Sequence, residues 1–520
     1  MSAKRTKRTR AFSISRHGGR GGRDSRSSRP RPPRKQAVSL ERYRGIIDDW
    51  QAFIAAAERP EPTVLRTRQG RISPDALAER LVAQGFRLAP KPGLPGFFEV
   101  EDGPGPVTAT LEHWLGLFYV QQASTGVAAP VLDPRPGERV LDMCSAPGGK
   151  TTHAADLMED RGCLVAAEIS DSRIRGLLSN VYRMGHSNIL VIRGDGREFP
   201  EGALFDRVLV DAPCGGEGTL RRKGGKSPYQ SAAFKTYVTR AQRGLLERAV
   251  RLTRPGGTIL YVTCTFAPEE NEAVVDHALR TLPVELEPID LPMPHAPGLT
   301  AFDGKVFDPR LEGAARIYPH HIDSGGLFLA KLIKLDDGDA GGRQANAWGP
   351  VPSLFATPDE QVSPEAVDDL VRIAVEELVG RFGVAPAFAA NLRWTLRGGR
   401  LWIHTLDEWP LAAWSDCPWR PISVGFRAME FDSRGRPRPT NDFLIWLGGQ
   451  LHERVCDVSA QELLTLGARG ALPMAEEILG PVALRYRSEI IGRGAGTQEG
   501  LKSEIPKERA TDLGRSIARD

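Results

Sequence analysis

From about residue 134 the chain alternates short apolar runs with longer stretches in which apolar residues recur at helical spacing. Runs of this length are typical of buried strands, and the longer stretches between them are typical of amphipathic helices. Repetition of strand, helix and strand predicts an α/β fold, a parallel sheet with helices on both faces. The expected strands are 139–142, 164–168, 188–192, 207–211 and 258–262, and the expected helices lie near 149–158, 171–184, 239–252 and 269–281.

The pattern differs on either side of this α/β segment. Residues 40–57 have helical spacing, and Ser73 followed by Pro74 is typical of an N-cap and first helical turn before residues 76–84. Residues 336–347 have the Asp-rich and Gly-rich composition of a linker, and seven of the nine Trp lie between 348 and 446. We therefore expect a small N-terminal helical or α+β region and a separate C-terminal region.

Composition and charge change this picture mainly at the N-terminus. Of the 520 residues 41% are hydrophobic and 26% are charged, which is typical of globular domains, and the length favours several of them. Residues 1–36 hold 13 Lys or Arg and one Asp, although the net charge of the chain is only +4. So polar a segment is expected to be disordered, and it is either a solvated tail or an electrostatic arm for a polyanion.

Several classes of protein are excluded by what the sequence lacks. No apolar run approaches the 18 residues of a membrane span, and no signal peptide is evident, so we expect a cytoplasmic protein without membrane contact. The six Cys include no Cys-x-x-Cys pair and no cluster with zinc spacing, so neither a disulfide framework nor a metal site is expected.

The turn after the first expected strand has the features of a ligand loop. A strand that ends in small residues and opens a helix directs backbone N–H groups at a ligand. A P-loop would need Gly where Cys144 stands, and a dinucleotide fingerprint would need a Gly before Gly148. A purely structural glycine turn is one alternative. A different α/β design binds S-adenosylmethionine through this turn and through acids at successive strand ends. Glu168 is then expected to hold the ribose hydroxyls and Asp195 the adenine amino group, while Asp211 ends the fourth strand.

Two cysteines follow strands at the same expected edge of the sheet. Cys214 stands in Asp211-Ala212-Pro213-Cys214, and Cys264 stands in Tyr261-Val262-Thr263-Cys264. Buried cysteines are usually inert, but a pair beside a methyl-donor loop favours methylation of cytosine at carbon 5. That carbon becomes nucleophilic only after a thiolate adds to carbon 6.

At this point the chain resembles the Nol/Nop/Sun family of RNA cytosine-5 methyltransferases, and within it the RsmF-like enzymes. The resemblance covers roughly residues 60–335 and rests on five segments. These are Leu117 to Ser124, Cys144 to Lys150, Asp211 to Gly218, Thr263-Cys264 with Pro268-Glu269-Glu270-Asn271-Glu272, and Arg316-Ile317-Tyr318-Pro319-His320 with Gly325-Gly326-Leu327-Phe328. The implied core is a Rossmann-like class I methyltransferase sheet.

The resemblance also implies roles for individual residues. Cys264 is the expected nucleophile, Cys214 assists product release, and Asp211 hydrogen-bonds the cytosine near ring nitrogen 3. Glu168, Asp195 and Asp211 contribute to the cofactor site together with Cys144, Ser145, Ala146, Pro147, Gly148, Gly149 and Lys150. The chain departs from the family pattern at Gly215, where Ser is usual, at Thr265, where Ser is common, and at Leu65-Arg66-Thr67-Arg68, which lacks the usual Asn.

The last 120 residues, an expected α+β or β-rich region, are similar to the PUA-like RNA-binding module of RsmF-type enzymes. The alternative is a β-rich domain that only stabilises the protein. The expected organisation is a basic Arg/Gly-rich tail (1–38), an N-terminal RNA-binding region (39–130), the methyltransferase domain (131–336), a linker (337–347), a first C-terminal domain (348–420) and a PUA-like domain (421–520).

The function that this implies is S-adenosylmethionine-dependent methylation of an RNA cytosine, with small-subunit ribosomal RNA as the expected substrate and no obligate protein partner. A transfer RNA methyltransferase and a catalytically silent RNA-binding assembly factor remain as alternatives. A DNA cytosine-5 methyltransferase is disfavoured because its Pro-Cys nucleophile is followed by Gln, whereas Gly215 follows Cys214 here.

Overall fold

The computed structural model describes residues 40–223, 231–336, 338, 348–354, 363–410, 419–474 and 478–517. The chain divides into a short unit, Met1–Gln36, and a large unit, Ala37–Asp520. The basic tail expected at 1–38 lies outside the described residues, as does all but residue 338 of the linker expected at 337–347. The description that follows concerns the large unit.

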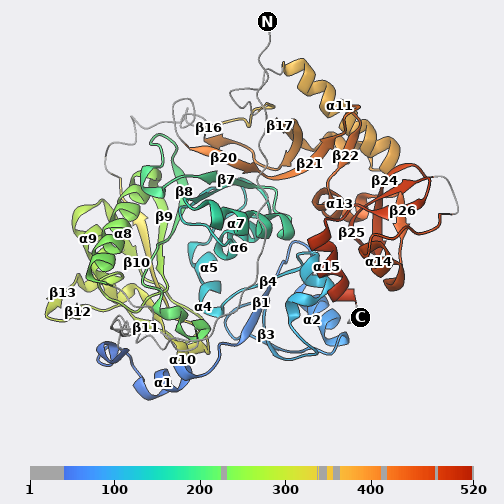
Figure 1. Cartoon of the computed structure of the whole chain (residues 1–520). Helices are drawn as coiled ribbons and strands as arrows, with labels where there is room; N and C mark the ends of the chain where they lie inside the picture. Colours follow the sequence, from blue (N-terminus) through green and yellow to red (C-terminus); the bar gives the residue numbers. More distant parts are fainter. Residues whose placement is uncertain are drawn as a thin grey trace, which may run out of the picture. The chain divides into compact units, whose positions relative to one another are not determined.

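A ten-stranded mixed sheet forms the centre of this unit (Figure 1). Its five parallel strands run in the order β7, β6, β5, β8 and β9, so the chain reverses direction across the sheet at β5. Such a reversal creates a crevice at the carboxyl ends of the strands. The parallel strands are β5 (Arg139–Asp142), β6 (Cys163–Glu168), β7 (Ile189–Arg193), β8 (Phe205–Asp211) and β9 (Thr253–Thr263).

Antiparallel strands extend both edges of the sheet. β15 pairs with β9, and β20 pairs with β7. On the β15 side the sheet continues through β14 and β11, while β10 pairs with another part of β15. These strands are β10 (Val284–Glu287), β11 (Ala296–Pro297), β14 (Ala315–Ile317), β15 (Leu327–Lys334) and β20 (Arg420–Val424).

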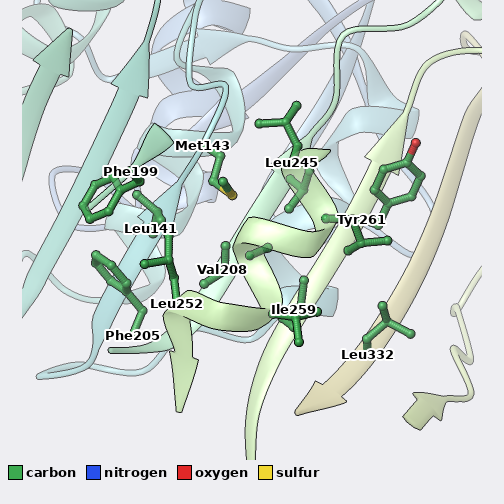
Figure 2. Packing of buried hydrophobic residues seen from close by; sticks show 14 of the residues in the cluster. Leu141, Met143, Phe199, Phe205, Val208, Leu245, Leu252, Ile259, Tyr261 and Leu332 are labelled. Atoms are coloured by element: carbon green, nitrogen blue, oxygen red, sulfur yellow. The ribbon is translucent and has the colours of Figure 1, made fainter. Parts of the chain in front are cut away.

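Helices cover both faces of the sheet, and the strand residues alternate between two cores. Leu141 and Val208 belong to one core, with Leu245 and Leu252 of α8, as Figure 2 shows. Their neighbour Leu209 faces the opposite core, which includes residues of α6 and α7. The expected α/β architecture is therefore confirmed. The covering helices are α5 (Ala128–Leu132), α6 (Gly149–Leu157), α7 (Asp171–Met184), α8 (Ala232–Leu252) and α9 (Glu272–Thr281).

The N-terminal region is an antiparallel four-stranded sheet with short helices. The strand order is β2, β3, β1, β4. The helix expected over 40–57 is interrupted, because a turn follows Tyr43 and a new helix begins only after Asp49, whose side chain accepts from the Ala52 N–H at 2.9 Å. The elements are η1 (Leu40–Tyr43), α1 (Trp50–Glu58), β1 (Thr63–Thr67), α2 (Pro74–Ala83), β2 (Arg87–Pro90), β3 (Phe97–Asp102), η2 (Val107–Ala109), α3 (Leu111–Trp114), β4 (Phe118–Val120) and α4 (Ala123–Gly126).

The C-terminal region contains two further four-stranded sheets, β17-β18-β21-β22 and β23-β24-β25-β26. Strand β20, which crosses the expected boundary at residue 420, lies in the central sheet. The strands are β16 (Trp348–Gly349), β17 (Arg393–Arg397), β18 (Arg400–His404), β19 (Trp409–Pro410), β21 (Phe426–Phe431), β22 (Pro437–Pro439), β23 (Val455–Asp457), β24 (Gly480–Tyr486), β25 (Glu489–Thr497) and β26 (Gly500–Ser503).

The remaining elements are short or lie at the periphery of these sheets. None of the helices in the described segments is both long and apolar enough to cross a lipid bilayer. The remaining elements are η3 (Gly196–Glu198), η4 (Glu217–Lys223), β12 (Ala301–Phe302), β13 (Lys305–Val306), η5 (Pro309–Gly313), α10 (Pro319–Ile322), α11 (Pro364–Phe382), α12 (Pro386–Ala390), α13 (Asn441–Leu447), η7 (Gly448–Gln450), α14 (Ala460–Gly467) and α15 (Lys507–Ile517).

The N-terminal region and the last sheet share one hydrophobic core. Leu65 of β1 and Leu77 of α2 belong to the same buried cluster as Leu484 of β24 and Leu513 of α15. Trp114 joins the same parts, because its indole N–H donates to the Ile491 carbonyl at 3.3 Å. Residues from opposite ends of the described chain are thus packed as one body.

Candidate active site

The turn between β5 and α6 is held by buried hydrogen bonds. Asp142 accepts from the Thr151 hydroxyl at 2.7 Å and from the Cys144 N–H at 3.2 Å. The hydroxyl and N–H of Ser145 both donate to the Ala167 carbonyl, at 2.9 and 3.0 Å. Burial raises the pKa of Asp142 to about 7, because its hydrogen bonds offset only part of the cost of a buried charge. The turn is thereby fixed against two strands.

Glycine is required where this turn enters the helix. Gly148 has φ +106°, a left-handed conformation that side chains rarely adopt, and a Cβ there would lie 3.1 Å from Leu177 Cδ1. Asn180 of α7 donates to the Pro147 carbonyl at 2.9 Å. A ligand can therefore come close to the backbone N–H groups at the N-terminal end of α6.

The two acids expected to contact a nucleoside differ in what surrounds them. Glu168 is buried, and its Oε1 accepts from the Ser170 N–H at 2.9 Å. Within the described chain Oε2 accepts no hydrogen bond, although Arg173 Nη1 forms an ion pair with it at 3.0 Å. Asp195, in contrast, is bound by Arg197, whose hydrogen bond is the main cause of a lowered Asp195 pKa. Oε2 of Glu168 can thus accept hydrogen bonds from ribose hydroxyls. An adenine amino group would have to share the Asp195 carboxylate with Arg197.

Lys150 and Asp211 form an ion pair between the turn and the end of β8. Their Nζ and Oδ2 atoms lie 2.8 Å apart. Burial by itself would lower the Lys150 pKa, but the charge of Asp211 and its hydrogen bond outweigh that effect, so the pKa is raised. The Lys150 ammonium also interacts electrostatically with Cys264. Lys150 therefore stands in the expected cofactor turn and within electrostatic reach of Cys264.

Cys214 and Cys264 meet at the carboxyl ends of β8 and β9. Their Sγ atoms are 3.3 Å apart, a hydrogen-bond distance that is much longer than a disulfide bond. The hydrogen bond with Cys264, followed by burial, raises the pKa of Cys214 well above its ordinary value. Cys214 is therefore held as a protonated thiol beside Cys264.

A buried carboxylate connects the two cysteine loops to the N-terminal segment. Glu217, only 1% exposed, accepts from the Thr265 hydroxyl at 2.7 Å and from the Tyr43 hydroxyl at 2.8 Å. A second bridge joins the loops directly, because the Gly218 N–H donates to the Cys264 carbonyl at 2.9 Å. The Cys214 and Cys264 loops and η1 are therefore tied together at Glu217.

A hollow of about 150 Å³ opens beside the ion pair. Its walls come from the end of β4, the ligand turn, the end of β8 and η4. The lining side chains include Tyr119, Gln122, Ser145, Lys150, Asp211 and Arg222. Because Lys150 and Asp211 lie in its wall, a planar base that enters the hollow meets a charged hydrogen-bonding pair.

The upstream Leu65-Arg66-Thr67-Arg68 segment is buried rather than directed into this hollow. Arg66 and Arg68 are each 2% exposed, and both form ion pairs with Asp156 of α6. Arg66 also donates to Gln121 Oε1 at 3.0 Å and to the Thr152 hydroxyl at 2.9 Å. These arginines join β1 to the helix that carries the ligand turn.

One described cluster has the residue types of a metal site, namely Asp48, His320 and His321. Its hydrogen bonds explain the cluster without a metal. Nδ1 of His321 accepts from the Tyr318 N–H at 3.2 Å, so a neutral ring carries its proton on Nε2. That Nε2 lies 2.8 Å from Asp48 Oδ2 and is therefore a donor to it. The cluster is a hydrogen-bonded contact between the N-terminal segment and α10.

Comparison with known proteins shows the family of this chain. Residues 129–333 match the family model described as 16S rRNA methyltransferase RsmB/F. The chain is 31% identical over 470 residues to ribosomal RNA small subunit methyltransferase F of Shigella boydii serotype 4 (strain Sb227), which covers 88% of this chain and 92% of the relative. The chain belongs to the RsmB/F family. The family resemblance stated from the motifs is thereby confirmed.

Other relatives of this RsmB/F chain differ in length. It is 34% identical over 326 residues to the 28S rRNA (cytosine-C(5))-methyltransferase of Mus musculus, covering 60% of this chain and 40% of the relative. The chain spans less than half the length of the eukaryotic relatives that it matches, between 39 and 48%. A solved methyltransferase homolog from Pyrococcus horikoshii has 34% identity and a TM-score of 0.50, covering 55% of this chain and 90% of that one.

The structure of this RsmB/F chain brings most of the expected site residues to one edge of the sheet. Residues 144–150, Asp211, Cys214 and Cys264 are joined there by the contacts described above, and Glu168 lies at the end of the adjacent β6. Asp195 caps η3, where Arg197 hydrogen-bonds its carboxylate.

Three contributors to the site, Tyr43, Glu217 and Arg222, are not among the residues expected from the sequence. Tyr43 lies far from the motifs in the chain, and nothing in its neighbourhood indicates a contact with the cysteine loops. Glu217 stood within a recognised motif, so its position could have been noted. Arg222 follows that motif, and its charge was the one available signal.

Proposed function

We propose that this chain transfers a methyl group from S-adenosylmethionine to carbon 5 of a cytosine in ribosomal RNA, as an RNA (cytosine-5-)-methyltransferase. The observation that carries the proposal is the 3.3 Å approach of Cys214 and Cys264 beside the Lys150–Asp211 ion pair. Two thiols, a cation and a carboxylate at one strand edge match the needs of covalent attack on a pyrimidine ring.

Cys264 is the nucleophile in this mechanism. The positive charge of Lys150 interacts with Cys264, and a cation beside a thiol stabilises the thiolate that attacks carbon 6. Asp211, held by Lys150, faces the hollow where it can hydrogen-bond the ring near nitrogen 3 and stabilise charge that develops during attack.

Cys214 acts at the end of the reaction. Its raised pKa keeps it a neutral thiol that can donate to or accept from Cys264 across the 3.3 Å contact. After carbon 5 has gained the methyl group, a base takes its proton, the electrons of that bond restore the double bond between carbons 5 and 6, and Cys264 leaves carbon 6 as a thiolate. Cys214 assists this elimination by hydrogen-bonding the departing sulfur.

The fit of S-adenosylmethionine rests on two features of the chain. The left-handed Gly148 allows close approach to the start of α6, and the buried Glu168 Oε2 accepts no hydrogen bond from the described residues, although Arg173 forms an ion pair with it. Residues 144–150 would hold the methionine part and Glu168 the ribose. When bound, S-adenosylmethionine supplies an electrophilic methyl group.

Small-subunit ribosomal RNA is the substrate favoured by the comparisons. The relative with that specificity in its name is matched over 92% of its length, whereas the 28S enzyme of the mouse is matched over 40%. The C-terminal sheets, with the basic tail, would position the RNA as a PUA-like module does. Such an enzyme would act in the cytoplasm, where small ribosomal subunits are its substrate.

Exchange of each cysteine tests the mechanism. Cys264→Ala should abolish methylation and form no covalent product. Cys214→Ala should form a protein–RNA adduct that accumulates, because attack remains possible while elimination is slowed. Denaturing gels of each variant with small-subunit ribosomal RNA and labelled S-adenosylmethionine would show a slow, nuclease-sensitive band for Cys214→Ala.

Transfer RNA and DNA serve as substrate controls under the same conditions. A band that forms with Cys264→Ala and is lost with Cys214→Ala would identify Cys214 as the nucleophile and refute the mechanism. Methyl incorporation into transfer RNA or DNA but not into ribosomal RNA would refute the substrate.

A further inference from the structure

Helix α8 exposes two aromatic side chains at its beginning. Phe234 is 40% exposed and Tyr237 is 62% exposed, one helical turn apart. Among the described residues with large exposed hydrophobic side chains, these are the two aromatic ones. Helix α8 packs on the sheet through residues from Val238 onward, including Leu245 and Val250 of the core. Folding of the helix therefore does not explain the exposed rings.

The same part of α8 carries cations without acidic partners. No carboxylate of the described chain forms an ion pair with Lys235, Arg240 or Arg243. Further along the helix the pattern changes, because Arg248 and Arg251 both form ion pairs with Glu201. Uncompensated charge is thus confined to the half of the helix that carries the aromatic rings.

Two of these cations, Arg240 and Arg243, line a depression next to the end of β7. It has a volume of about 540 Å³, and its other lining residues are Arg197, Thr236, Thr239, Gly244 and the paired Glu247 and His277. Arg197 is the residue that binds Asp195, and its guanidinium also interacts with Tyr237. The depression therefore continues from the edge of the sheet that carries the proposed site.

We propose that Phe234, Tyr237, Arg240 and Arg243, which follow one another at i, i+3 spacing and are here called the α8 surface, bind single-stranded RNA next to the target cytosine. The inference rests on the proposed function, because it assigns a further contact of the same substrate. Bases stack on exposed aromatic rings, and the neighbouring cations neutralise the phosphates that connect those bases. An acidic protein would satisfy the cations, but it would leave the paired rings without a specific partner.

Helix α8 is also tied to the cysteine loop, which gives this surface a defined register. Gln242, on the buried side of the helix, donates to the Pro213 carbonyl at 2.9 Å and to Glu270 at 3.0 Å. Pro213 directly precedes Cys214. A strand held on the α8 surface is therefore held at a fixed offset from the thiols, which favours one cytosine over its neighbours.

Two double variants test the α8 surface. Phe234→Ala with Tyr237→Ala should weaken binding of deproteinised small-subunit ribosomal RNA about tenfold or more, because each stacked base contributes roughly 1–3 kcal/mol. Arg240→Gln with Arg243→Gln should reduce the salt dependence, lowering the slope of log affinity against log salt by about 1.4. Arg248→Gln with Arg251→Gln is the matched control, since it removes the same charge from the same helix where Glu201 already pairs both residues.

The outcomes separate this inference from the proposed function. S-adenosylmethionine affinity and the thermal midpoint should stay unchanged in both test variants, because the altered side chains are exposed. RNA affinity and salt slope equal to those of the control would overturn the α8 surface, even if the wild-type chain methylates ribosomal RNA. A wild-type chain that binds RNA through α8 but methylates no RNA would instead refute the proposed function.

Discussion

At the scale of single residues, Glu217 explains how the loops that carry the two thiols are held close to each other. A buried carboxylate is stable only when donors replace the water it has lost, and Glu217 receives them from two separate segments. Tyr43 comes from η1, Thr265 from the Cys264 loop, and Glu217 itself follows the Cys214 loop. The carboxylate therefore joins elements that the sheet alone does not hold together.

Loss of the Tyr43 hydroxyl should slow chemistry more than binding. In Tyr43→Phe we expect kcat to fall about tenfold with KM for RNA unchanged, because a lost hydrogen bond to a charged group removes about 1.5–3 kcal/mol from the positioned state. Tyr318→Phe is the matched control, since Tyr318 lies in the same cluster and its hydroxyl donates to the Ile46 carbonyl instead. Equal kcat values for the two variants, measured by single turnover, would contradict a positioning role for Tyr43.

Glu168 gives a second prediction for a single residue. Glu168→Gln should weaken binding of S-adenosylmethionine by about 10-fold to 100-fold, because a neutral amide replaces the charged acceptor for the ribose. Calorimetric titration provides the dissociation constant. Asp171→Asn, a change at an exposed carboxylate on the adjoining helix, is the control. If both variants bind the donor as the wild-type chain does, Glu168 has no part in the ribose site.

At the scale of elements, the sequence predicted the strands and helices of the central sheet well and the contacts between distant segments poorly. Buried parallel strands are apolar runs, so β5 to β9 could be read from their composition. The helix over 40–57 was wrong as one element, because the chain turns between Tyr43 and Asp49, and the contact of Tyr43 with Glu217 that accompanies this turn has no local signal.

In the candidate site, too, the positions of residues were predictable and the contacts between side chains were not. Cys214, Cys264 and Asp211 follow strands, so their meeting at one edge was predictable from topology. The pairing of Lys150 with Asp211 and the occupation of Asp195 by Arg197 depend on side-chain conformations that spacing does not determine.

A substitution in the last sheet tests whether this sheet and the N-terminal region share one core. Leu484→Ala in β24 should cost about 2–5 kcal/mol and should speed hydrogen exchange at Leu65 and Arg66 of β1, since Leu484 and Leu65 lie in one buried cluster. Leu444→Ala removes an equally buried leucine from the neighbouring cluster and serves as the control. Exchange in β1 that responds equally to both changes would show that the cores are not distinct.

At the scale of the whole molecule, buried histidines determine how stability depends on pH. Burial lowers the pKa of His113 to about 3 and that of His404 to about 4. Between these values and the ordinary 6.5 the unfolded chain binds more protons than the folded one, so stability is lost as pH falls through this window. Asp142 acts in the opposite direction, because its raised pKa makes the folded chain bind the extra proton below about 7.

Replacement of one histidine should reveal this dependence. In His404→Gln the free energy of unfolding should fall less steeply between pH 6.5 and 4, with the wild-type contribution of His404 amounting to about 3 kcal/mol over that range. Urea unfolding at several pH values gives the slope. His452→Gln, at an exposed histidine, should leave the slope as it is. Parallel profiles for all three proteins would contradict the assignment.

The core that joins β1 and α2 to β24 and α15 has a consequence for biosynthesis. The ribosome releases Leu65 and Leu77 long before Leu484 and Leu513, yet all four are buried in one cluster. During most of translation the apolar side of the N-terminal region therefore has no cover and is a target for chaperones. Maturation is complete only when the last helix has emerged, so a chain truncated before α15 would leave that side exposed even though its methyltransferase sheet is intact.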